Sequence, residues 1–186
     1  VWTWGDNSYG KLGNNSSEIS FTPVQVKGEG GVGVLDEVIA ISTANNSTLA
    51  LKSDGTVWAW GCNTYGQLGD DSVTRSQTPV QVKGENGIGY LNNVVAISSG
   101  WGHSIALKSD GSVWAWGHNT YGQLGDGSTV NRPFPVQVKE ESGANKLEDI
   151  VAIDAGTYHT IARTSNGTAY TWGCNTDGQL GDGTYE

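Results

Sequence analysis

Val57-Trp58-Ala59-Trp60-Gly61 and Val113-Trp114-Ala115-Trp116-Gly117 are two copies of one pattern, and the interval between the copies decides the fold. The pattern also appears as Val1-Trp2-Thr3-Trp4-Gly5 at the start of the chain and as Ala169-Tyr170-Thr171-Trp172-Gly173 near its end. The four copies begin at residues 1, 57, 113 and 169, so each lies 56 residues after the previous one. A constant period of this length indicates a protein built from stacked repeats.

The period divides the 186 residues into units 1–56, 57–112 and 113–168, with 169–186 as a partial fourth unit, all within a single array. Each unit is expected to contain four short strands, because runs rich in Val, Ile and Trp alternate with turns that contain Gly, Asp or Pro. The expected strands are a first at 37–42, 93–98 and 149–154, a second at 48–52, 104–108 and 160–164, a third at the Trp pattern itself, and a fourth at 23–27, 79–83 and 135–139.

The links between the strands also follow a pattern. The second and third strands are joined by Ser53-Asp54-Gly55, Ser109-Asp110-Gly111 and Ser165-Asn166-Gly167. Asp-Gly and Asn-Gly between apolar runs predict tight hairpins, because both central positions can take positive φ. Each expected fourth strand opens with a proline, which suits the edge of a sheet because no ladder hydrogen bond is lost there.

The two tryptophans of each third strand lie two residues apart and therefore point to the same face of their sheet. One four-stranded sheet cannot bury that face alone, so Trp58, Trp60, Trp114 and Trp116 are expected to pack between neighbouring units. These observations predict an all-β fold, a β-propeller of four-stranded antiparallel blades. One chain provides just over three units and hence an incomplete ring. Two explanations stay open: a piece of a longer protein, or several copies that complete a ring as a homo-oligomer.

Two longer motifs recur with the same period. Trp-Gly-x-Asn-x-x-Gly-Gln-Leu-Gly-Asp occurs at 60–70, 116–126 and 172–182, with a variant at 4–14, and Gly-x-x-His-Ser/Thr-x-Ala occurs at 100–106 and 156–162. These motifs resemble the RCC1 (regulator of chromosome condensation) repeat family over essentially the whole chain. The resemblance implies a propeller, and the likeness between units is similar to that in bacterial secreted or surface proteins of this family. The first unit departs from the motif, with Ala44-Asn45-Asn46-Ser47 in place of Gly-x-x-His.

Composition argues against several functions. The formal net charge is −9 and the basic residues are scattered, which argues against nucleic acid as a partner because phosphates require clustered Lys and Arg. No apolar run approaches the roughly 18 residues of a membrane span, so no membrane insertion is expected. Cys62 and Cys174 form no CxxC or Cys/His cluster and occupy one repeat position two units apart, so free thiols and no metal are expected.

Other motifs do not support chemistry. Gly28–Gly33 matches the dinucleotide fingerprint G-x-G-x-x-G, but it lies in a loop between two expected strands, so no cofactor is expected. The Gly-Asp-Gly turns at 125–127 and 181–183 offer one carboxylate each, too few for calcium. Because no nucleophile, base or carboxylate pair recurs in a catalytic arrangement, the chain is not expected to be an enzyme.

The three histidines fall into two groups. His103 and His159 occupy one repeat position, and such duplication favours a structural role in which the rings bridge backbone groups near the propeller centre. His118 occupies the position held by Asp6, Cys62 and Cys174 in the other units. Because that position varies freely, it is expected to face solvent.

The variable links indicate where a partner would bind. Strands alternate in direction, so the links from first to second and from third to fourth strand share one face of the ring, and these links differ most between units. Trp101, Tyr158, Arg75 and Arg132 are the candidate partner-binding residues there, because exposed aromatics and Arg are enriched at binding hot spots. The alternative for Trp101 and Tyr158 is that they line the central channel and only pack.

The sequence therefore predicts a protein-interaction scaffold without catalysis, and the resemblance adds an extracellular or surface location in a bacterium as an expectation. One alternative is a guanine-nucleotide exchange factor for a small GTPase, although the loop insertions on which that activity depends have no match here. The other is an ultraviolet-sensing propeller. Gly100-Trp101-Gly102-His103 resembles the Gly-Trp-Arg-His motif of the plant receptor, with Gly102 in place of Arg.

Overall fold

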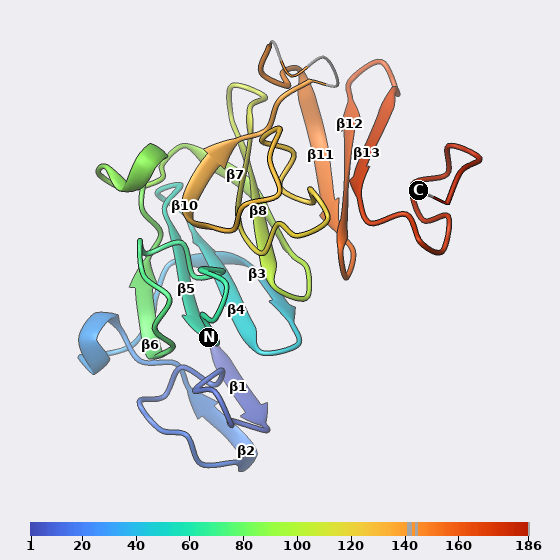
Figure 1. Cartoon of the computed structure of the whole chain (residues 1–186). Coiled ribbons are helices and arrows are strands. Elements are labelled where there is room, and N and C mark those ends of the chain that lie inside the picture. Colours follow the sequence, from blue (N-terminus) through green and yellow to red (C-terminus); the bar gives the residue numbers. More distant parts are fainter. Residues whose placement is uncertain (141–142, 144, 186) are drawn as a thin grey trace.

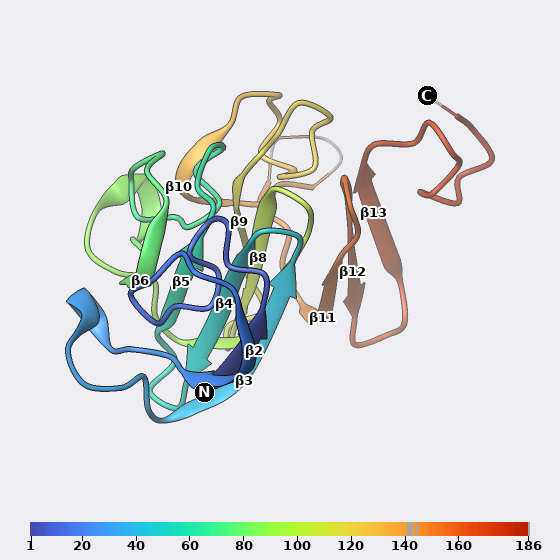
Figure 2. The same cartoon turned by 90° about the horizontal axis from the view of Figure 1, so that it is seen from below.

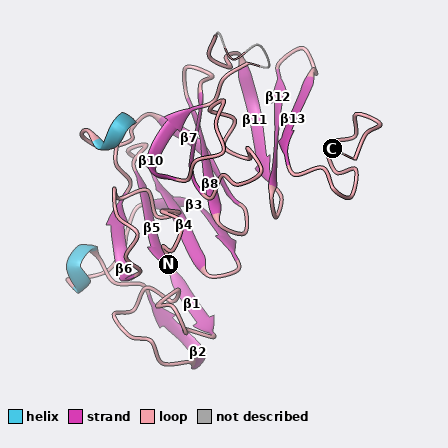
Figure 3. Ribbon diagram, in the orientation of Figure 1, coloured by secondary structure: helices cyan, strands magenta, loops and turns pink. Residues whose placement is uncertain are grey.

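The computed structural model describes residues 1–140, 143 and 145–185. These residues form four antiparallel sheets with strand orders β1-β2, β3-β4-β5-β6, β7-β8-β9-β10 and β11-β12-β13 (Figures 1 and 3). We call these sheets blades 1 to 4. The strands are β1 Trp2–Gly5, β2 Ser20–Gln25, β3 Val38–Ala44, β4 Ser47–Lys52, β5 Val57–Gly61, β6 Ser76–Gln81, β7 Val94–Ser99, β8 His103–Lys108, β9 Val113–Gly117, β10 Arg132–Gln137, β11 Ile150–Ala155, β12 His159–Thr164 and β13 Ala169–Gly173.

The blades follow one another around an arc, with the two-stranded blade at one end and the three-stranded blade at the other (Figures 1 and 2). The first strands β3, β7 and β11 are in contact with one another in series, whereas β6 and β10 are the outer edges of their sheets. This arrangement is part of a β-propeller, and it confirms the predicted all-β fold with an incomplete ring.

The apolar cores lie between blades. Trp114 and Trp116 of β9 belong to one buried cluster with Leu49, Leu51 and Val57 of blade 2, and Trp116 is completely buried. A second cluster joins blades 3 and 4. A third places Trp60, with the half-buried Trp58 beside it, against Val26 and Leu35 of the first unit. Because these tryptophans pack against the preceding blade, burial of their rings requires a neighbour.

The tryptophans of β1 differ from their repeats. Trp2 and Trp4 are 59% and 63% exposed, and Ile41 on β3 is also exposed. Blade 1 consists of β1 and β2 among the described residues, and these tryptophans lie on the side of that sheet that faces away from blade 2. Inter-blade packing of the Trp pair thus applies from blade 2 onward, and not to the first copy of the pattern.

We call the segment between the third and fourth strands of a blade its three–four link, and name the other links in the same way. A backbone carbonyl in the three–four link of blades 1, 2 and 3 accepts hydrogen bonds from the next blade. The carbonyl of Gln67 accepts hydrogen bonds from Trp116 Nε1 and from Ser104 Oγ, both at 2.9 Å. Ser104 and Trp116 are cross-strand partners on β8 and β9, so one pair supplies both donors. The same arrangement recurs at the other two blade junctions, where the carbonyl of Lys11 accepts from Trp60 and Thr48, and that of Gln123 accepts from Trp172 and Thr160.

The two–three hairpins use positive φ at one of their two central positions. Only their glycines have positive φ, 78° at Gly55 and 81° at Gly111, and the preceding aspartates do not. The carboxylate of Asp54 accepts hydrogen bonds from the backbone N–H and the hydroxyl of Thr56. The predicted hairpins are therefore present, and of the two positions that could take positive φ only the glycine does so, while the Asp side chain holds an Asx-type turn.

The fourth strands begin earlier than predicted. Pro79 lies inside β6, three residues after its start, and Pro23 occupies the same place in β2. Proline is tolerated there because β6 pairs only with β5, and the register between the two strands shifts between Ala59 and Gly61. The edge position was predicted correctly, whereas the position of proline at the opening of the strand was wrong.

The links from fourth to first strands contain little helix. Gly28–Gly33 includes the single-turn 3-10 helix η1, Glu29–Gly31, and the next link contains η2, Glu85–Gly87. The fingerprint match therefore lacks the following α-helix that dinucleotide binding needs. Within the described residues no helix has the length and apolar character required to cross a membrane.

Candidate functional site

Five aromatic rings from three blades meet on one face of the propeller. Trp101 comes from the β7–β8 turn and Tyr158 from the β11–β12 turn, while Tyr65 and Tyr121 lie in the three–four links of blades 2 and 3. His118 directly follows β9. We refer to these five residues as the aromatic cluster. They share a face because the one–two turns and three–four links lie at the same ends of the alternating strands.

The rings contact one another in tilted or edge-on geometries. The centroid of Trp101 lies 5.4 Å from those of both Tyr65 and Tyr158, and Tyr121 lies 5.4 Å from Tyr158. Such pairs contribute about 0.5–1.5 kcal/mol each beyond the area that they bury. Tyr121 is 47% exposed, whereas Tyr65, Trp101 and Tyr158 are half-buried. The cluster is thus a packed aromatic surface, and Tyr121 is its exposed member.

His118 is the buried centre of this cluster, and its predicted solvent-facing position was wrong. It is 8% exposed, and its ring centroid lies 4.6 Å from that of Tyr65. Nδ1 is 2.7 Å from the side-chain nitrogen of Gln123, whose Oε1 accepts the backbone N–H of Tyr121. Nδ1 of His118 therefore accepts a hydrogen from the Gln123 amide, and Nε2 of His118 carries the ring hydrogen and donates it to the hydroxyl of Thr120. Burial lowers the pKa of His118.

The cysteines at the same repeat position are also buried, which corrects the same prediction for them. Cys62 and Cys174 are 8% and 7% exposed, and neither forms a disulfide. Their sulfur atoms lie 3.4 Å from Thr64 Oγ1 and 3.3 Å from Thr176 Oγ1, respectively. The position tolerates Cys or His because each can contact the hydroxyl of the threonine two residues later.

His103 lies beneath the one–two turn of blade 3 and is 1% exposed. Its Nε2 is 3.1 Å from the hydroxyl of Thr160 in blade 4. The expected bridge to backbone groups was therefore wrong for this ring, because its partner is a side-chain hydroxyl across the blade junction. His159, at the equivalent position of blade 4, is half-buried.

Gly100 and His103 fit together tightly. A Cβ at Gly100 would lie 2.2 Å from the His103 imidazole and 2.4 Å from the carbonyl oxygen of Gly156, so no larger residue fits. The first unit carries Ala44 and Ser47 at these two positions. Packing explains why the first unit differs from the motif at both positions together: Ser47 is smaller than histidine and leaves room for the methyl group of Ala44.

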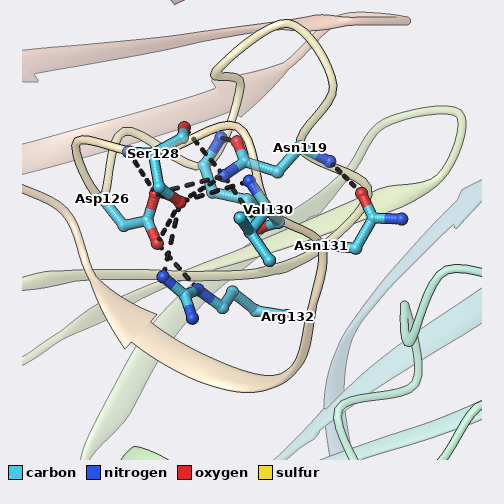
Figure 4. A network of polar contacts seen from close by, with 7 residues as sticks. Asn119, Asp126, Ser128, Val130, Asn131 and Arg132 are labelled. Atoms are coloured by element: carbon cyan, nitrogen blue, oxygen red, sulfur yellow. Dashed lines mark hydrogen bonds and ion pairs between the residues drawn. The ribbon is translucent and has the colours of Figure 1, made fainter.

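A buried asparagine shapes each three–four link, a role that sequence reasoning missed. In blade 3, Asn119 Nδ2 donates to Asp126 and to the carbonyls of Ser128 and Val130 (Figure 4). Its Oδ1 accepts the backbone N–H of Leu124. Asn7, Asn63 and Asn175 make corresponding bonds in the other links. The signal was present in the sequence, because this Asn occurs in all four copies of the motif.

The two candidate arginines have different environments. Arg132 donates from Nε to Asp126 Oδ2 at 2.8 Å and from Nη2 to Ser128, so its charge is used within its own loop (Figure 4). Burial raises the pKa of Asp126, but the hydrogen bonds from Ser128 and Arg132 outweigh it, and the net pKa is lowered. Arg75 is exposed and makes one long contact, 3.4 Å, with the carbonyl of Ser8 in the neighbouring link.

A shallow depression adjoins the cluster on the inner side of the ring. It has a volume of about 490 Å³ and is lined by the one–two turns of blades 2, 3 and 4, including Asn45, Gly100 and Trp101. Trp101 therefore belongs both to the aromatic cluster and to the wall of this depression. In the described part of the chain, no group of three or more His, Cys, Asp or Glu residues is placed to hold a metal ion.

The structure brings together two predicted residues, Trp101 and Tyr158, and joins to them three that the prediction omitted. Tyr65 and Tyr121 could have been found, because tyrosine stands at the same repeat position in Tyr9, Tyr65 and Tyr121. The role of His118 could not, because it depends on contacts with Gln123 and with rings of three different blades.

The fold and site together define a part of a β-propeller that displays a cluster of packed aromatic rings on the one–two turns and three–four links of one face. The family model described as RCC1-like domain matches residues 1–186. The chain therefore belongs to the RCC1-like domain family.

Individual relatives agree with this assignment. The chain is 38% identical to mouse E3 ubiquitin-protein ligase HERC2 over 99% of its length, which is 4% of that relative. It is 32% identical to the Arabidopsis thaliana ultraviolet-B receptor UVR8 over 98% of its length and 39% of the receptor. Among solved structures, human WBSCR16 superposes with a TM-score of 0.78 at 27% identity and yeast RCC1 (Prp20) with 0.77 at 22% identity. The chain spans less than half of each of these proteins, 46% of WBSCR16 and 42% of the yeast protein.

Proposed function

We propose that this chain is a protein-interaction domain that performs no catalysis and binds its partner through the aromatic cluster. The observation that carries the proposal is the joining of Trp101, Tyr121 and Tyr158 into one partly exposed surface, in which Trp101 and Tyr158 come from turns that differ between blades. Aromatic side chains that are already held in place lose little conformational entropy on binding, so they are effective anchors at interfaces.

Hydrogen-bonding capacity supports the same surface. The half-buried rings of Tyr65 and Tyr158 and the exposed ring of Tyr121 each carry a hydroxyl at the face that holds the cluster. A tyrosine provides apolar contact through its ring and a directed hydrogen bond through its hydroxyl, which is the reason for its enrichment at interfaces. Arg75 is the exposed cation nearest in sequence to this part of blade 2, and its guanidinium can extend the surface.

The test is affinity capture from the source organism with the whole protein, comparing three forms. Trp101→Ala removes the ring that contacts both Tyr65 and Tyr158. The matched control, Ile88→Ala, removes an apolar side chain that is 79% exposed but lies outside the cluster. We expect a partner that is captured by the wild type and by Ile88→Ala and lost with Trp101→Ala, with unchanged far-ultraviolet circular dichroism in all three. Equal capture by Trp101→Ala would place binding elsewhere.

Guanine-nucleotide exchange is the second candidate, and one observation bears on it: the superposition on yeast RCC1. At 22% identity that likeness concerns the fold alone. An assay of labelled nucleotide release from a small GTPase tests this activity, and we expect no acceleration by this chain. Ultraviolet sensing is less favoured, because Gly102 replaces the arginine of the motif and lies against Tyr65 and His118, where a Cβ would already come within 3.1 Å of the Tyr65 ring.

A further inference from the structure

Charged residues are distributed unevenly around the aromatic cluster. The links at this face, 5–20, 61–76, 117–132 and 173–185, contain more acidic than basic side chains. The three basic residues are Lys11, Arg75 and Arg132; the seven acidic ones are Asp6, Glu18, Asp70, Asp71, Asp126, Asp177 and Asp182.

Two of the three basic side chains at this face are paired with carboxylates of the protein. Lys11 pairs with Asp6 at 2.6 Å and Arg132 with Asp126 at 2.8 Å. Arg75 is exposed and unpaired with any carboxylate among the described residues, and makes only a long 3.4 Å contact with the carbonyl of Ser8. The remaining acidic side chains, including the exposed Glu18, Asp71 and Asp177, have no ion-pair partner among the described residues. The face around the cluster therefore carries unneutralised negative charge.

The protein itself shows which groups its aromatic rings accept. Lys83 Nζ lies 4.6 Å from the centroid of the Tyr90 ring, and Lys108 Nζ lies 5.7 Å from that of Trp114. Both are cation–π contacts away from the aromatic cluster. Within the described structure no cation stacks on a ring of the cluster, although Tyr121 is 47% exposed. Its open side therefore has electron-rich ring faces that attract a cation, on a face of the propeller whose links are acidic overall.

From this charge complementarity we propose that the aromatic cluster binds a protein segment that carries arginine or lysine. The cationic side chains of that segment stack on Trp101 and Tyr121. Acidic residues of the same face, such as Asp177, attract the segment. The inference rests on the proposed function and adds the chemistry of the partner. Stacking on a desolvated ring gives affinity, and the unpaired carboxylates speed association and discriminate against acidic segments.

The experiment measures fluorescence polarisation of labelled twelve-residue peptides with the whole protein. The probes are an alternating Arg-Ser peptide, a Lys-Ser peptide, a Glu-Ser peptide and a neutral peptide with citrulline in place of Arg. We expect saturable binding of the Arg and Lys peptides, none of the Glu peptide, and affinity that falls severalfold as salt rises from about 50 to 300 mM, because the pairing is electrostatic.

Variants assign the binding to the cluster. Trp101→Ala and Tyr121→Ala are expected to weaken the Arg peptide about tenfold, whereas Ile88→Ala leaves it unchanged. Asp177→Asn is expected to weaken it about two- to threefold. Its charge-matched control is Glu148→Gln, which removes an exposed carboxylate from the opposite ends of the strands and should have no effect.

The outcomes separate this inference from the proposed function. Equal binding of the citrulline and Arg peptides, preference for the Glu peptide, or insensitivity to Trp101→Ala would each overturn the inference. If the Arg and Lys peptides fail to bind while a partner from the capture experiment is still lost with Trp101→Ala, the inference fails and the proposed function stands. If capture is also insensitive to Trp101→Ala, both fail.

Discussion

The imidazole of His103 donates a hydrogen bond from Nε2 to the hydroxyl oxygen of Thr160, 3.1 Å away in the next blade. The direction of this bond is determined by a third residue, since the single hydroxyl hydrogen of Thr160 is donated to the carbonyl of Gln123 at 2.8 Å. Nδ1 of His103 is buried without a partner in the described structure, so a hydrogen on it would be left unpaired, and the buried ring carries its hydrogen on Nε2 alone. The blade junction thus requires a neutral histidine.

This requirement predicts that the free energy of unfolding falls on acidification at pH values above those at which carboxylates titrate. Burial lowers the pKa of His103 from 6.5 to about 3, helped by the nearby His118 and His159. Below pH 6.5 the unfolded chain binds a proton at this residue and the folded chain does not, so lowering the pH favours unfolding. The free energy of unfolding should fall by about 2 kcal/mol between pH 7 and pH 5. Urea titrations at the two pH values measure it.

The control for this pH dependence is His103→Ser, which copies Ser47 of the first unit. This variant should be less stable at pH 7 but should lose much less stability on acidification. Burial also lowers the pKa of His118, so a smaller dependence of the same sign remains. An identical loss in wild type and variant would show that His103 is not the responsible group.

Gly100→Ala should destabilise the protein by about 2 kcal/mol or more, because its methyl group would overlap the imidazole of His103 and the carbonyl of Gly156. The double variant Gly100→Ala/His103→Ser reproduces the Ala44/Ser47 pair of the first unit. It should be more stable than the sum of the two single changes by about 1 kcal/mol. Thermal and urea unfolding of the four forms measure this coupling, and strict additivity would contradict the packing explanation.

Trp116→Phe removes the indole N–H that binds the carbonyl of Gln67 and leaves space between blades 2 and 3. We expect a loss of about 2–3 kcal/mol in the free energy of unfolding. The matched control is Trp4→Phe at the same repeat position, where the side chain is 63% exposed and the expected change is below about 0.5 kcal/mol. Similar losses for both variants would refute inter-blade packing as the cause.

Asn119→Ala should destabilise the three–four link of blade 3 by about 3 kcal/mol, because it leaves the carbonyls of Ser128 and Val130 and the N–H of Leu124 without their partner. Asn119→Asp should cost more at neutral pH, since a carboxylate would face Asp126 and two carbonyl oxygens. Hydrogen exchange of residues 119–131 reports the loosening. Asn92→Ala, at an exposed position, serves as the control, and an equal effect there would exclude the proposed network.

Much of the fold could be predicted from the sequence because the same strand and turn pattern occurs in four copies. The Trp pattern at a constant interval, and the Asp-Gly or Asn-Gly hairpins, identified four strands per unit before any coordinates. The details that could not be predicted depend on side-chain contacts and on strand register. The carboxylate of Asp54 holds its turn without positive φ, and the bulge in β6 accommodates Pro79 within the strand. Neither effect follows from residue type alone.

The candidate site was less accessible to sequence reasoning. Trp101 and Tyr158 could be nominated because they stand in variable links of a repeat, and that nomination remains a prediction until binding is measured. The burial of His118, and of Cys62 and Cys174 at the same position, contradicted the expectation drawn from their variability. Variation at this repeat position was interpreted as solvent exposure, but the side chains of His118, Cys62 and Cys174 are all buried.

The sequence by itself determined the blade, since the period, the alternation of apolar residues and the glycine turns are local properties that each unit carries in full. Only the tertiary structure decided which side chains of different blades meet. Tyr65, Trp101 and Tyr158 lie far apart along the chain, and the carbonyl of Gln67 binds a tryptophan 49 residues away. Those contacts depend on the angle at which one sheet packs on the next, and that angle is fixed by packing and hydrogen bonds between blades and not by any segment alone.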